Sequence, residues 1–283
     1  MEVFQSKEKI KNKIADLKAK EVTIGFVATM GALHLGHLSL VKKALAKNQI
    51  VVVSIFVNPT QFDNQTDLDN YPRTLDHDIQ LLKTVSKERI LVFAPAVGDI
   101  YTDGVKSNPF SFDGLEFEME GKFRAGHFNG VGTIVKALLE IVQPDNAYFG
   151  EKDFQQFLII KKLVEKYNLP VNIIGCKISR ETNGLAMSSR NERLNASYKK
   201  AAPFIYKTLL SARKKFGTES AFKVKEWVIE QFKNNELLEL EYFLIADDQN
   251  LKPIQRKSKK KKYRAFIAVY ADDVRLIDNI ALN

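Results

Sequence analysis

Two histidines set three residues apart are the first candidates for chemistry in this chain. His34 and His37 lie between Gly31 and Gly36, in the stretch Met30 to His37 (Met-Gly-Ala-Leu-His-Leu-Gly-His). An apolar run precedes this stretch and residues at helical spacing follow it, which predicts a strand-to-helix turn. A helix begins with unpaired N–H groups and a partial positive charge, so such a turn suits a phosphate. If the helix begins at or before His34, the two imidazoles share one face and would donate hydrogen bonds to the same anion.

The glycine patterns of two common phosphate-binding loops are absent from this turn. The sequence has neither G-x-x-x-x-G-K-[ST] nor, at this position, G-x-G-x-x-G. The pattern H-x-G-H instead resembles the first signature of the nucleotidyltransferases related to class I aminoacyl-tRNA synthetases. That resemblance implies binding of the ATP triphosphate. Two surface histidines near a helix start are the alternative.

Two further predicted strand ends carry polar side chains. Asn58 and Gln61 follow the apolar run 50–57, and Lys152, Asp153 and Gln156 follow the short strand 147–149. Because ligands bind beyond the carboxyl ends of parallel strands, we expect Asn58 and Gln61 near the histidine turn. Lys152 would neutralise phosphate charge, and Asp153 would cap a helix or hold a ribose or metal.

Three other groups of polar residues are less specific. Arg124 and His127 stand in a glycine-flanked loop that either approaches an anion or has no such role. Residues 76–78 (Asp-His-Asp) point in different directions on a helix, so we interpret them as a charged helix face rather than a metal site. Ser188, Ser189 and Arg190 follow an Asn-Gly turn, and a mobile segment of that kind could close over a triphosphate.

The elements that must position these residues alternate regularly in the first two thirds of the chain. The periodicity predicts helices over 4–18, 38–47, 75–85, 131–142 and 154–167, and strands over 22–28, 50–57, 90–93, 147–149 and 171–176. Residues 96–126 have poor periodicity, and short strands are possible there. This alternation predicts an α/β fold with a Rossmann-like, doubly wound parallel sheet.

The pattern changes after about residue 176. A polar loop, 179–194, leads to predicted helices over 197–216 and 219–233, and then to strands over 242–246, 265–270 and 274–277. We therefore expect two domains: residues 1–178 as a Rossmann-like domain that binds ATP and substrate, and residues 179–283 as a smaller C-terminal α+β lid domain.

Composition limits the class of protein. The net charge of +9 is local, because the run 256–264 holds seven basic and no acidic residues, leaving only +2 elsewhere. A solvated loop between strands is the favoured interpretation of this run, so we expect no nucleic-acid partner. No apolar run reaches the roughly 18 residues of a membrane span, and the N-terminus lacks a signal-peptide core. The one cysteine, Cys176, is predicted to be a small core residue. We expect a soluble, cytoplasmic protein.

Taken together, the motifs resemble the pantoate–β-alanine ligase (pantothenate synthetase) family from one end of the chain to the other. The matching segments are MGALHLGH (30–37), VVVSIFVNPTQF (51–62), YPRTL (71–75), GHFNGV (126–131), VQPDNAYFGEKDFQQ (142–156), NGLAMSSRN (183–191) and RLIDN (275–279). VNPTQF and FGEKDFQQ are the most specific of these. The C-terminal region departs most from the family pattern, in residues 239–254 and in the lysine-rich run.

The resemblance implies an AMP-forming ligase with ATP as a substrate and Mg²⁺ as cofactor. Pantoate would attack the α-phosphate to give pantoyl adenylate and pyrophosphate, and β-alanine would then displace AMP. It also implies a homodimer. The catalytic residues would be His34, His37, Lys152 and Arg190, with His37 as proton donor. Gln61 and Gln156 would hold pantoate, and Asp153 would bind the metal. The implied ATP site comprises Met30, Gly31, Ala32, Leu33, His34, Leu35, Gly36, His37, Gly150, Glu151, Lys152, Asp153, Ser179, Met187, Ser188, Ser189 and Arg190.

Elementary chemistry agrees with that reaction. Attack of a carboxylate on a phosphate accumulates negative charge, which cations and fixed donors stabilise. Two rival functions remain open from the sequence. One is a cytidylyl- or adenylyltransferase that keeps H-x-G-H, and the other is a nucleic-acid-binding module built on Lys259–Lys262.

Overall fold

The computed structural model describes residues 1–62, 65–254 and 256–283, in two compact units. The first unit comprises Met1–Glu151 and Gln155–Lys177, and the second comprises Lys152–Phe154 and Ile178–Asn283. The boundary expected from the sequence was 178/179. The three residues Lys152–Phe154, although they follow a strand of the first unit, are grouped with the second.

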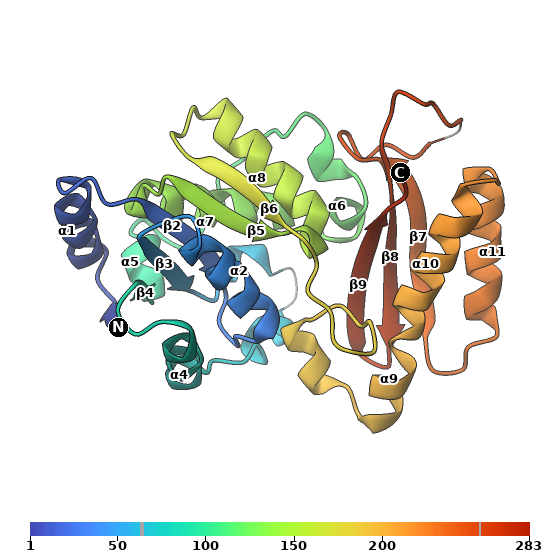
Figure 1. Cartoon of the computed structure of the whole chain (residues 1–283), viewed down its shortest axis with the longest axis horizontal. Helices are drawn as coiled ribbons and strands as arrows, with labels where there is room; N and C mark the ends of the chain where they lie inside the picture. The colour runs from blue at the N-terminus through green and yellow to red at the C-terminus, as the bar shows by residue number, and fades with distance from the viewer. Residues whose placement is uncertain (63–64, 255) are drawn as a thin grey trace. The chain divides into compact units, whose positions relative to one another are not determined.

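A six-stranded parallel sheet forms the centre of the first unit (Figure 1). Its strands are β1 (Glu2–Phe4), β2 (Ile24–Thr29), β3 (Ile50–Ile55), β4 (Ile90–Phe93), β5 (Asn146–Gly150) and β6 (Asn172–Cys176). Their order is β1-β4-β3-β2-β5-β6, and every neighbouring pair is parallel. The predicted α/β class with a doubly wound parallel sheet is confirmed.

The principal helices of the first unit follow the predicted periodicity. They are α1 (Lys7–Lys18), α2 (Leu35–Leu45), α4 (Leu75–Val85), α7 (His127–Val142) and α8 (Phe154–Lys166), with shorter helices α3 (Gln65–Asp69), α5 (Val97–Ile100) and α6 (Glu120–Phe123). Two predictions were wrong. Phe4 lies in strand β1, which pairs with β4, rather than in the first helix. The segment 96–126 contains short helical turns and no strand among its residues, all of which are described.

The strand order places the switch point of the sheet between β2 and β5. From β2 the chain proceeds outward to β3 and β4, and after α7 it returns to β5 on the other side of β2. Right-handed crossovers then place α2 and α8 on opposite faces of the sheet. In doubly wound sheets ligands bind at this point, beyond the carboxyl ends of the strands. A ligand site is therefore expected among the residues that follow β2, β3 and β5.

The core of the first unit lies on both faces of this sheet. One face is covered by α2 and α4, whose Leu38, Val41 and Leu82 pack with Val51 and Val53 of β3. The strand β3 is apolar at almost every position, as a strand covered on both sides must be. Helix α7 contacts β2 and also packs against α1. Rigid packing of this kind holds the strand ends in fixed positions.

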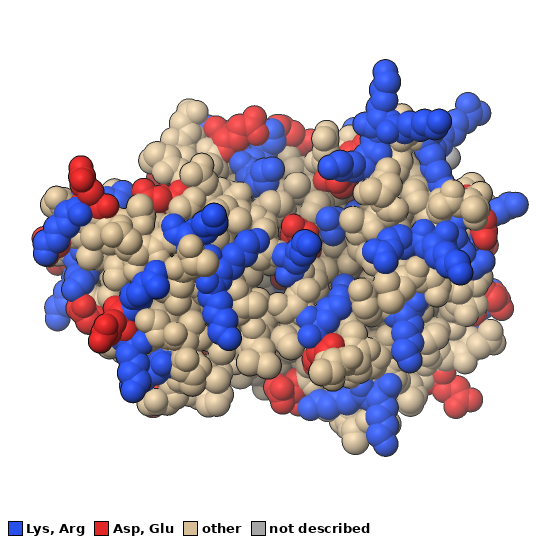
Figure 2. All heavy atoms as spheres, in the orientation of Figure 1, with Lys and Arg blue, Asp and Glu red and all other residues tan. Residues whose placement is uncertain are grey.

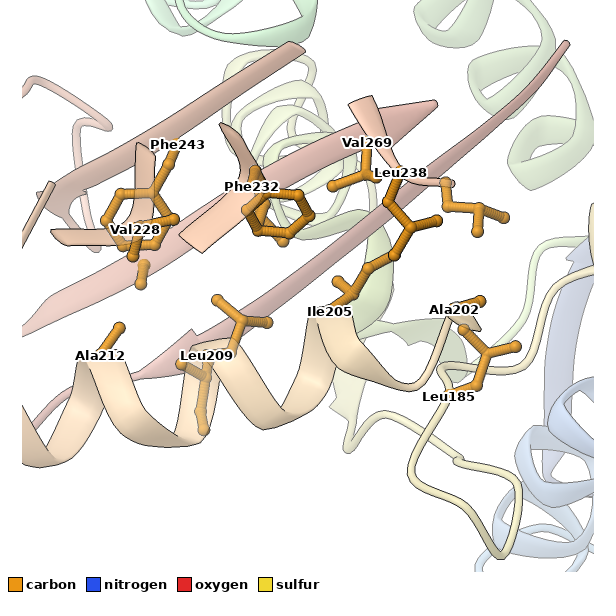
Figure 3. Close-up of a cluster of buried hydrophobic side chains, with 14 of the residues drawn as sticks. Leu185, Ala202, Ile205, Leu209, Ala212, Val228, Phe232, Leu238, Phe243 and Val269 are labelled. Atoms are coloured by element: carbon orange, nitrogen blue, oxygen red, sulfur yellow. The ribbon is translucent and has the colours of Figure 1, made fainter. Parts of the chain in front are cut away.

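The second unit is a three-stranded antiparallel sheet packed against helices. Its strands β7 (Glu239–Asp247), β8 (Tyr263–Ala271) and β9 (Val274–Ala281) are ordered β7-β8-β9, and its helices are α9 (Ala196–Ala201), α10 (Phe204–Phe216) and α11 (Ala221–Lys233). The predicted single helix over 197–216 is two helices, separated at Pro203. Figure 3 shows the core, in which Leu209 of α10 and Phe232 of α11 lie close to Phe243 and Val269 of the sheet.

The basic run lies mostly in the connection between β7 and β8. Lys and Arg side chains gather over this connection at the upper right of Figure 2, whereas acidic and basic groups are interspersed elsewhere on that face. Residues 256–262 are exposed, but Tyr263 and Arg264 are buried in β8. Among the described residues, no helix combines the length and apolarity needed to cross a membrane.

Candidate active site

The two histidines form the start of helix α2. His34 is the N-cap residue, and its Nδ1 accepts a hydrogen bond from the Gly36 N–H (3.1 Å). The Nδ1 of His37 in turn accepts from the His34 N–H (3.3 Å), which completes a capping box made of two imidazoles. The ring centroids lie 4.1 Å apart. His34 has an extended backbone and precedes the first helical residue, Leu35, so the capping box, and not the predicted shared helix face, brings the two rings together.

This geometry fixes the tautomer of both rings. A nitrogen that accepts a hydrogen bond from a backbone N–H carries no proton itself. In the neutral imidazole the proton of His34 and of His37 then resides on Nε2. Each ring consequently presents an N–H donor on the edge opposite to its cap, which is the group needed to bind a phosphate oxygen.

A buried carboxylate accepts hydrogen bonds from the backbone of the turn before His34. Asp78 of α4 is fully buried, and its two oxygens accept from the N–H groups of Ala32 (3.0 Å) and Leu33 (2.8 Å). The hydroxyl of Thr74 donates to the same carboxylate (3.2 Å). Burial raises the pKa of Asp78 above its ordinary value, although these three donors oppose the rise. Of the residues interpreted as a charged helix face, Asp76 and His77 are exposed, whereas Asp78 is buried and does not belong to that face.

The backbone of this turn is strained. Gly31 and Ala32 both have positive φ, +83° and +48°, and for a residue with a Cβ this conformation costs roughly 1–2 kcal/mol. The N–H of Gly31 donates a hydrogen bond to the Thr29 hydroxyl (3.2 Å). The N–H groups of Ala32, Leu33, His34 and Gly36 also donate within the protein. The expectation of unpaired N–H groups here was thus wrong for these five residues.

Gln61 lies beside this turn, as predicted. Its Nε2 donates to the sulfur of Met30 (2.9 Å), the first residue of the histidine stretch. Its Oε1 accepts from Asn58 Nδ2 (3.1 Å), and Asn58 is itself buried with a further bond to the Gly130 carbonyl (3.2 Å). The amide of Gln61 is therefore oriented by both of its ends.

Arg124 and His127 support Gln61 from its backbone. The Gln61 carbonyl accepts from His127 Nδ1 (2.7 Å) and from the Arg124 guanidinium (3.2 Å). Since a carbonyl only accepts, Nδ1 carries the proton of His127, and its Nε2 accepts from Arg124 (3.2 Å). His127 is buried. The contact with Gln61 was not among the two interpretations of this loop, and the choice between an anion-binding loop and a plain one stays open.

A tyrosine completes the polar layer beneath Gln61. The hydroxyl of Tyr101 donates to Asn58 Oδ1 (2.5 Å) and also lies 2.8 Å from the Thr60 hydroxyl. Burial raises the pKa of Tyr101, so it stays a neutral donor. Tyr101 was not singled out from the sequence, because it lies in the aperiodic segment 96–126.

The end of β5 contributes the next group. β5 is a neighbour of β2, the strand that leads to the histidine turn; Gly150 ends β5 and Glu151 follows it. In the following helix the two glutamines differ. Gln155 is buried and binds the backbone of residues 115, 118 and 120, whereas Gln156 is half-buried. Gln155 is therefore structural, which leaves Gln156 as the glutamine available to a substrate.

Lys152 and Asp153 belong to the second unit. The Lys152 carbonyl accepts from Asn279 Nδ2 of β9 (2.9 Å), and the ring of Phe154 stacks on the Arg264 guanidinium (3.9 Å). Arg264 also donates to Asn279 Oδ1 (2.6 Å). The side chains of Lys152 and Asp153 form an ion pair of 3.6 Å. Asn279, which the sequence did not mark as functional beyond its place in RLIDN, thus holds the lysine segment.

Residues 179–187, called the signature hairpin below because Ser188, Ser189 and Arg190 follow it, form a hairpin in the same unit. The Ser179 carbonyl accepts from the Met187 N–H (3.0 Å), and Gly184 takes φ of +96° at the predicted Asn-Gly turn. Arg180 pairs with Asp278 through two bonds of 2.6 and 2.9 Å and stacks 3.6 Å over Tyr206. The hairpin is therefore anchored to β9, the strand that also carries Asn279.

Ser188, Ser189 and Arg190 follow the hairpin directly. Ser188 caps a short 3₁₀ helix, η4 (Ser189–Arg193), by accepting from the Arg190 N–H (3.3 Å). Asn191 is buried and joins this turn to the hairpin through Glu181 (2.9 Å) and the Ala186 carbonyl (3.1 Å). Ser188, Ser189 and Arg190 are all half-buried.

The donor set agrees with a magnesium ion that arrives with the nucleotide. Within the described ranges no group of three or more His, Cys, Asp or Glu side chains could hold a metal by itself. Mg²⁺ on a nucleotide needs only one or two carboxylates besides the phosphates. The Asp153 carboxylate, half-exposed beside Lys152, is the candidate for such a ligand.

Cys176 has the predicted structural role. It ends β6, it is buried, and burial raises the pKa of its thiol, which opposes thiolate chemistry.

A doubly wound sheet with paired imidazole donors at its switch point defines a nucleotide-binding α/β enzyme. The family model of pantoate-beta-alanine ligase matches residues 2–281. The pantothenate synthetase of Christiangramia forsetii is 57% identical over all of both chains, and that of Flavobacterium psychrophilum is 55% identical over all of both chains.

Solved structures agree. The pantothenate synthetase of Thermus thermophilus superposes with a TM-score of 0.91 at 35% identity, over 100% of this chain and 99% of that one. The pantoate-beta-alanine ligase of Francisella tularensis, complexed with beta-gamma ATP and beta-alanine, gives 0.81 at 36% identity, over 100% and 98%. The chain belongs to the pantoate–β-alanine ligase family.

Proposed function

We propose that this chain makes pantothenate in two steps, the first of them on the turn 30–37. A carboxylate oxygen of pantoate attacks the α-phosphate of ATP, and the bond to pyrophosphate breaks. The amine of β-alanine then attacks the acyl carbon of pantoyl adenylate, and AMP leaves with the oxygen that bridged carbon and phosphorus. Ligation of pantoate to β-alanine is the activity of the family, and the Francisella tularensis relative was solved with an ATP analogue and β-alanine.

The paired imidazoles carry the proposal most directly. With Nδ1 of both rings occupied by backbone N–H groups, His34 and His37 offer Nε2–H donors. Donors fixed in advance stabilise charge that develops on a phosphate without further reorganisation. We assign both rings to the phosphates of ATP, with His37 as the proton donor. The other residues of the turn, Met30 to Gly36, shape it.

Gln61 and Gln156 are assigned to pantoate. The Gln61 amide is fixed by Asn58 and Met30, and its carbonyl by His127 and Arg124. A primary amide donates and accepts at once, which suits a substrate that carries both hydroxyl and carboxylate groups. The carboxylate of pantoate is ionised near neutral pH, so its attack needs no general base.

The second unit is assigned the remaining phosphate contacts. Lys152, Ser188, Ser189 and Arg190 would bind phosphate oxygens, with Asp153 on a Mg²⁺ that neutralises phosphate charge. The backbone of Ser179 and Met187 would touch the nucleotide, as would Gly150 and Glu151 at the end of β5. Lys152 and the signature hairpin share β9 as an anchor. A lid that excludes water would protect the hydrolysable adenylate.

A homodimer in the cytoplasm is part of the same proposal, and the family resemblance supports it. Light scattering would report twice the mass of the 32.2 kDa chain.

Assays of the separate products test the two-step reaction. With ATP, Mg²⁺, pantoate and β-alanine, AMP and pantothenate should appear in step, and neither should appear without pantoate. With ATP, Mg²⁺ and pantoate but no β-alanine, pyrophosphate should form up to about one equivalent per enzyme. No turnover with β-alanine, but turnover with CTP or a phosphate-ester acceptor, would favour the rival transferase.

A further inference from the structure

The carboxylate of Asp78 lies in the interior of the protein, where charged groups are rare. It is fully buried in the first turn of α4, more than forty residues along the chain from the turn that it contacts. Burying a charge is costly unless hydrogen bonds compensate it. The compensating donors are two successive backbone N–H groups, of Ala32 and Leu33, together with the Thr74 hydroxyl.

The two backbone donors lie in and next to the part of the turn whose backbone conformation is strained. Gly31 and Ala32 both have positive φ, which residues with a Cβ avoid. Successive N–H groups that converge on one point form an anion-binding concavity, and here the anion is Asp78. The carboxylate also packs closely against Gly31, where a Cβ would lie 3.1 Å from Asp78 Oδ2. A larger residue at position 31 would therefore displace the carboxylate.

The residue that follows Leu33 is His34, the first of the two histidines assigned to the phosphates. Leu33 is buried and immediately precedes His34, whose extended backbone starts α2 and whose N–H orients His37. A change in the direction of the chain at Ala32 or Leu33 would therefore move both imidazoles. Misplacement of a catalytic group by 1 Å costs about 100-fold in rate.

We infer that Asp78 is a positioning residue for adenylate formation, holding the turn that aims His34 and His37 at the phosphates. Only an ionised carboxylate offers an acceptor to both N–H groups and to Thr74 at once. An amide in its place would turn an NH₂ group toward one of these donors. The inference rests on the proposed role of the two histidines, and it assigns their placement to a residue of α4.

The test compares Asp78→Asn with Asp76→Asn. Both substitutions remove one negative charge from the first turn of α4, but Asp76 is exposed. The first readout is pantoate-dependent formation of pyrophosphate without β-alanine. The second is conversion of supplied pantoyl adenylate and β-alanine into pantothenate. Thermal unfolding of each variant reports the folded fraction.

Asp78→Asn should slow the first reaction by roughly 10- to 100-fold per folded molecule, with the KM for β-alanine unchanged and the second reaction within threefold of wild type. Asp76→Asn should match wild type in every readout. A purely structural role would lower both reactions together, in proportion to the folded fraction. Equal first-step rates for the two variants would overturn the inference.

A second variant decides the matter if Asp78→Asn does not fold. Thr74→Val removes one of the three hydrogen bonds and keeps the carboxylate. It should slow the first reaction about threefold without altering the KM for β-alanine, and an unchanged rate would contradict the inference. If wild-type enzyme itself forms no pyrophosphate from pantoate and ATP, the proposed function fails, and this outcome is distinct from a failure of Asp78 alone.

Discussion

Asn279 of β9 donates a hydrogen bond from its side-chain Nδ2 to the main-chain carbonyl of Lys152, over 2.9 Å. The two residues are far apart in sequence, yet they belong to the same compact unit, together with the signature hairpin. Arg264 braces this contact by binding Asn279 Oδ1 and stacking on Phe154. The contact explains why Lys152, two residues after the end of β5 in the first unit, belongs to the second unit.

Asn279→Ala should impair the use of ATP. Loss of a buried hydrogen bond to the Lys152 carbonyl is worth about 1–1.5 kcal/mol, so kcat/KM for ATP should fall about tenfold. The matched control is Asn283→Ala, because Asn283 also donates its side-chain amide to a backbone carbonyl, that of Lys261 (2.9 Å), but is exposed. Equal kcat/KM for ATP in the two variants would contradict a role of Asn279 in the use of ATP.

Arg180→Ala should destabilise the second unit strongly. Asp278 would be left buried without its bidentate partner, and breaking a buried pair costs roughly 3 kcal/mol or more. Arg193→Ala is the control, because its ion pair with Asp273 is largely exposed and is worth less than about 1 kcal/mol. Chemical denaturation of both variants measures the difference. Similar losses of stability would show that the hairpin is not anchored through Arg180.

The buried carboxylate of Asp78 makes a specific prediction about stability and pH. Its pKa is raised in the folded protein, mainly by burial, from an ordinary value of 3.8. As the pH rises past that value the unfolded chain loses this proton first, so the contribution of Asp78 to folding stability falls until the folded pKa is passed. The unfolding free energy of wild type minus that of Asp78→Asn should therefore decrease between pH 4 and the raised pKa, and then level off. Urea titrations across this range measure it, and a difference that grows with pH would mean that the hydrogen bonds outweigh burial.

His37→Ala should slow pantoate-dependent pyrophosphate formation by about 100- to 1000-fold, the usual effect of removing a donor to developing charge. Its capping bond is weak at 3.3 Å, so the fold should persist. His77→Ala is the control, because His77 is exposed on α4. Rates for His37→Ala within a few-fold of this control would exclude His37 from the first step.

Much of the first unit could be predicted because its elements are local. The limits of α4 and β4 agree with the prediction, since strict periodicity and a following proline mark them. β1 was missed because three residues become a strand only by pairing with β4, far along the chain. The segment 96–126 lacks periodicity, since its short turns are held by individual contacts such as Glu116 to the backbone of Phe112 and Gly114.

The site could be predicted where side chains follow strands, and not where buried groups support them. The strand-end rule predicted that Gln61 lies beside the turn of His34 and His37, and the structure places it there. The burial of Asp78 was not predicted, because the charged neighbours Asp76 and His77 suggested a charged helix face. The sequence nevertheless contained a sign of that burial. Leu75, Asp78, Leu82 and Val85 recur at helical spacing, so a carboxylate stood on the apolar stripe of α4. A charge at such a position is rarely buried without a function or a partner.

The most direct test of the proposed reaction is to follow the carboxylate oxygens of pantoate. With both oxygens labelled as ¹⁸O, one label should be recovered in the phosphate of AMP and one in the amide carbonyl of pantothenate. This follows because the attacking oxygen remains on phosphorus when the amine displaces AMP. Unlabelled AMP, or label in inorganic phosphate formed together with ADP, would contradict a pantoyl adenylate.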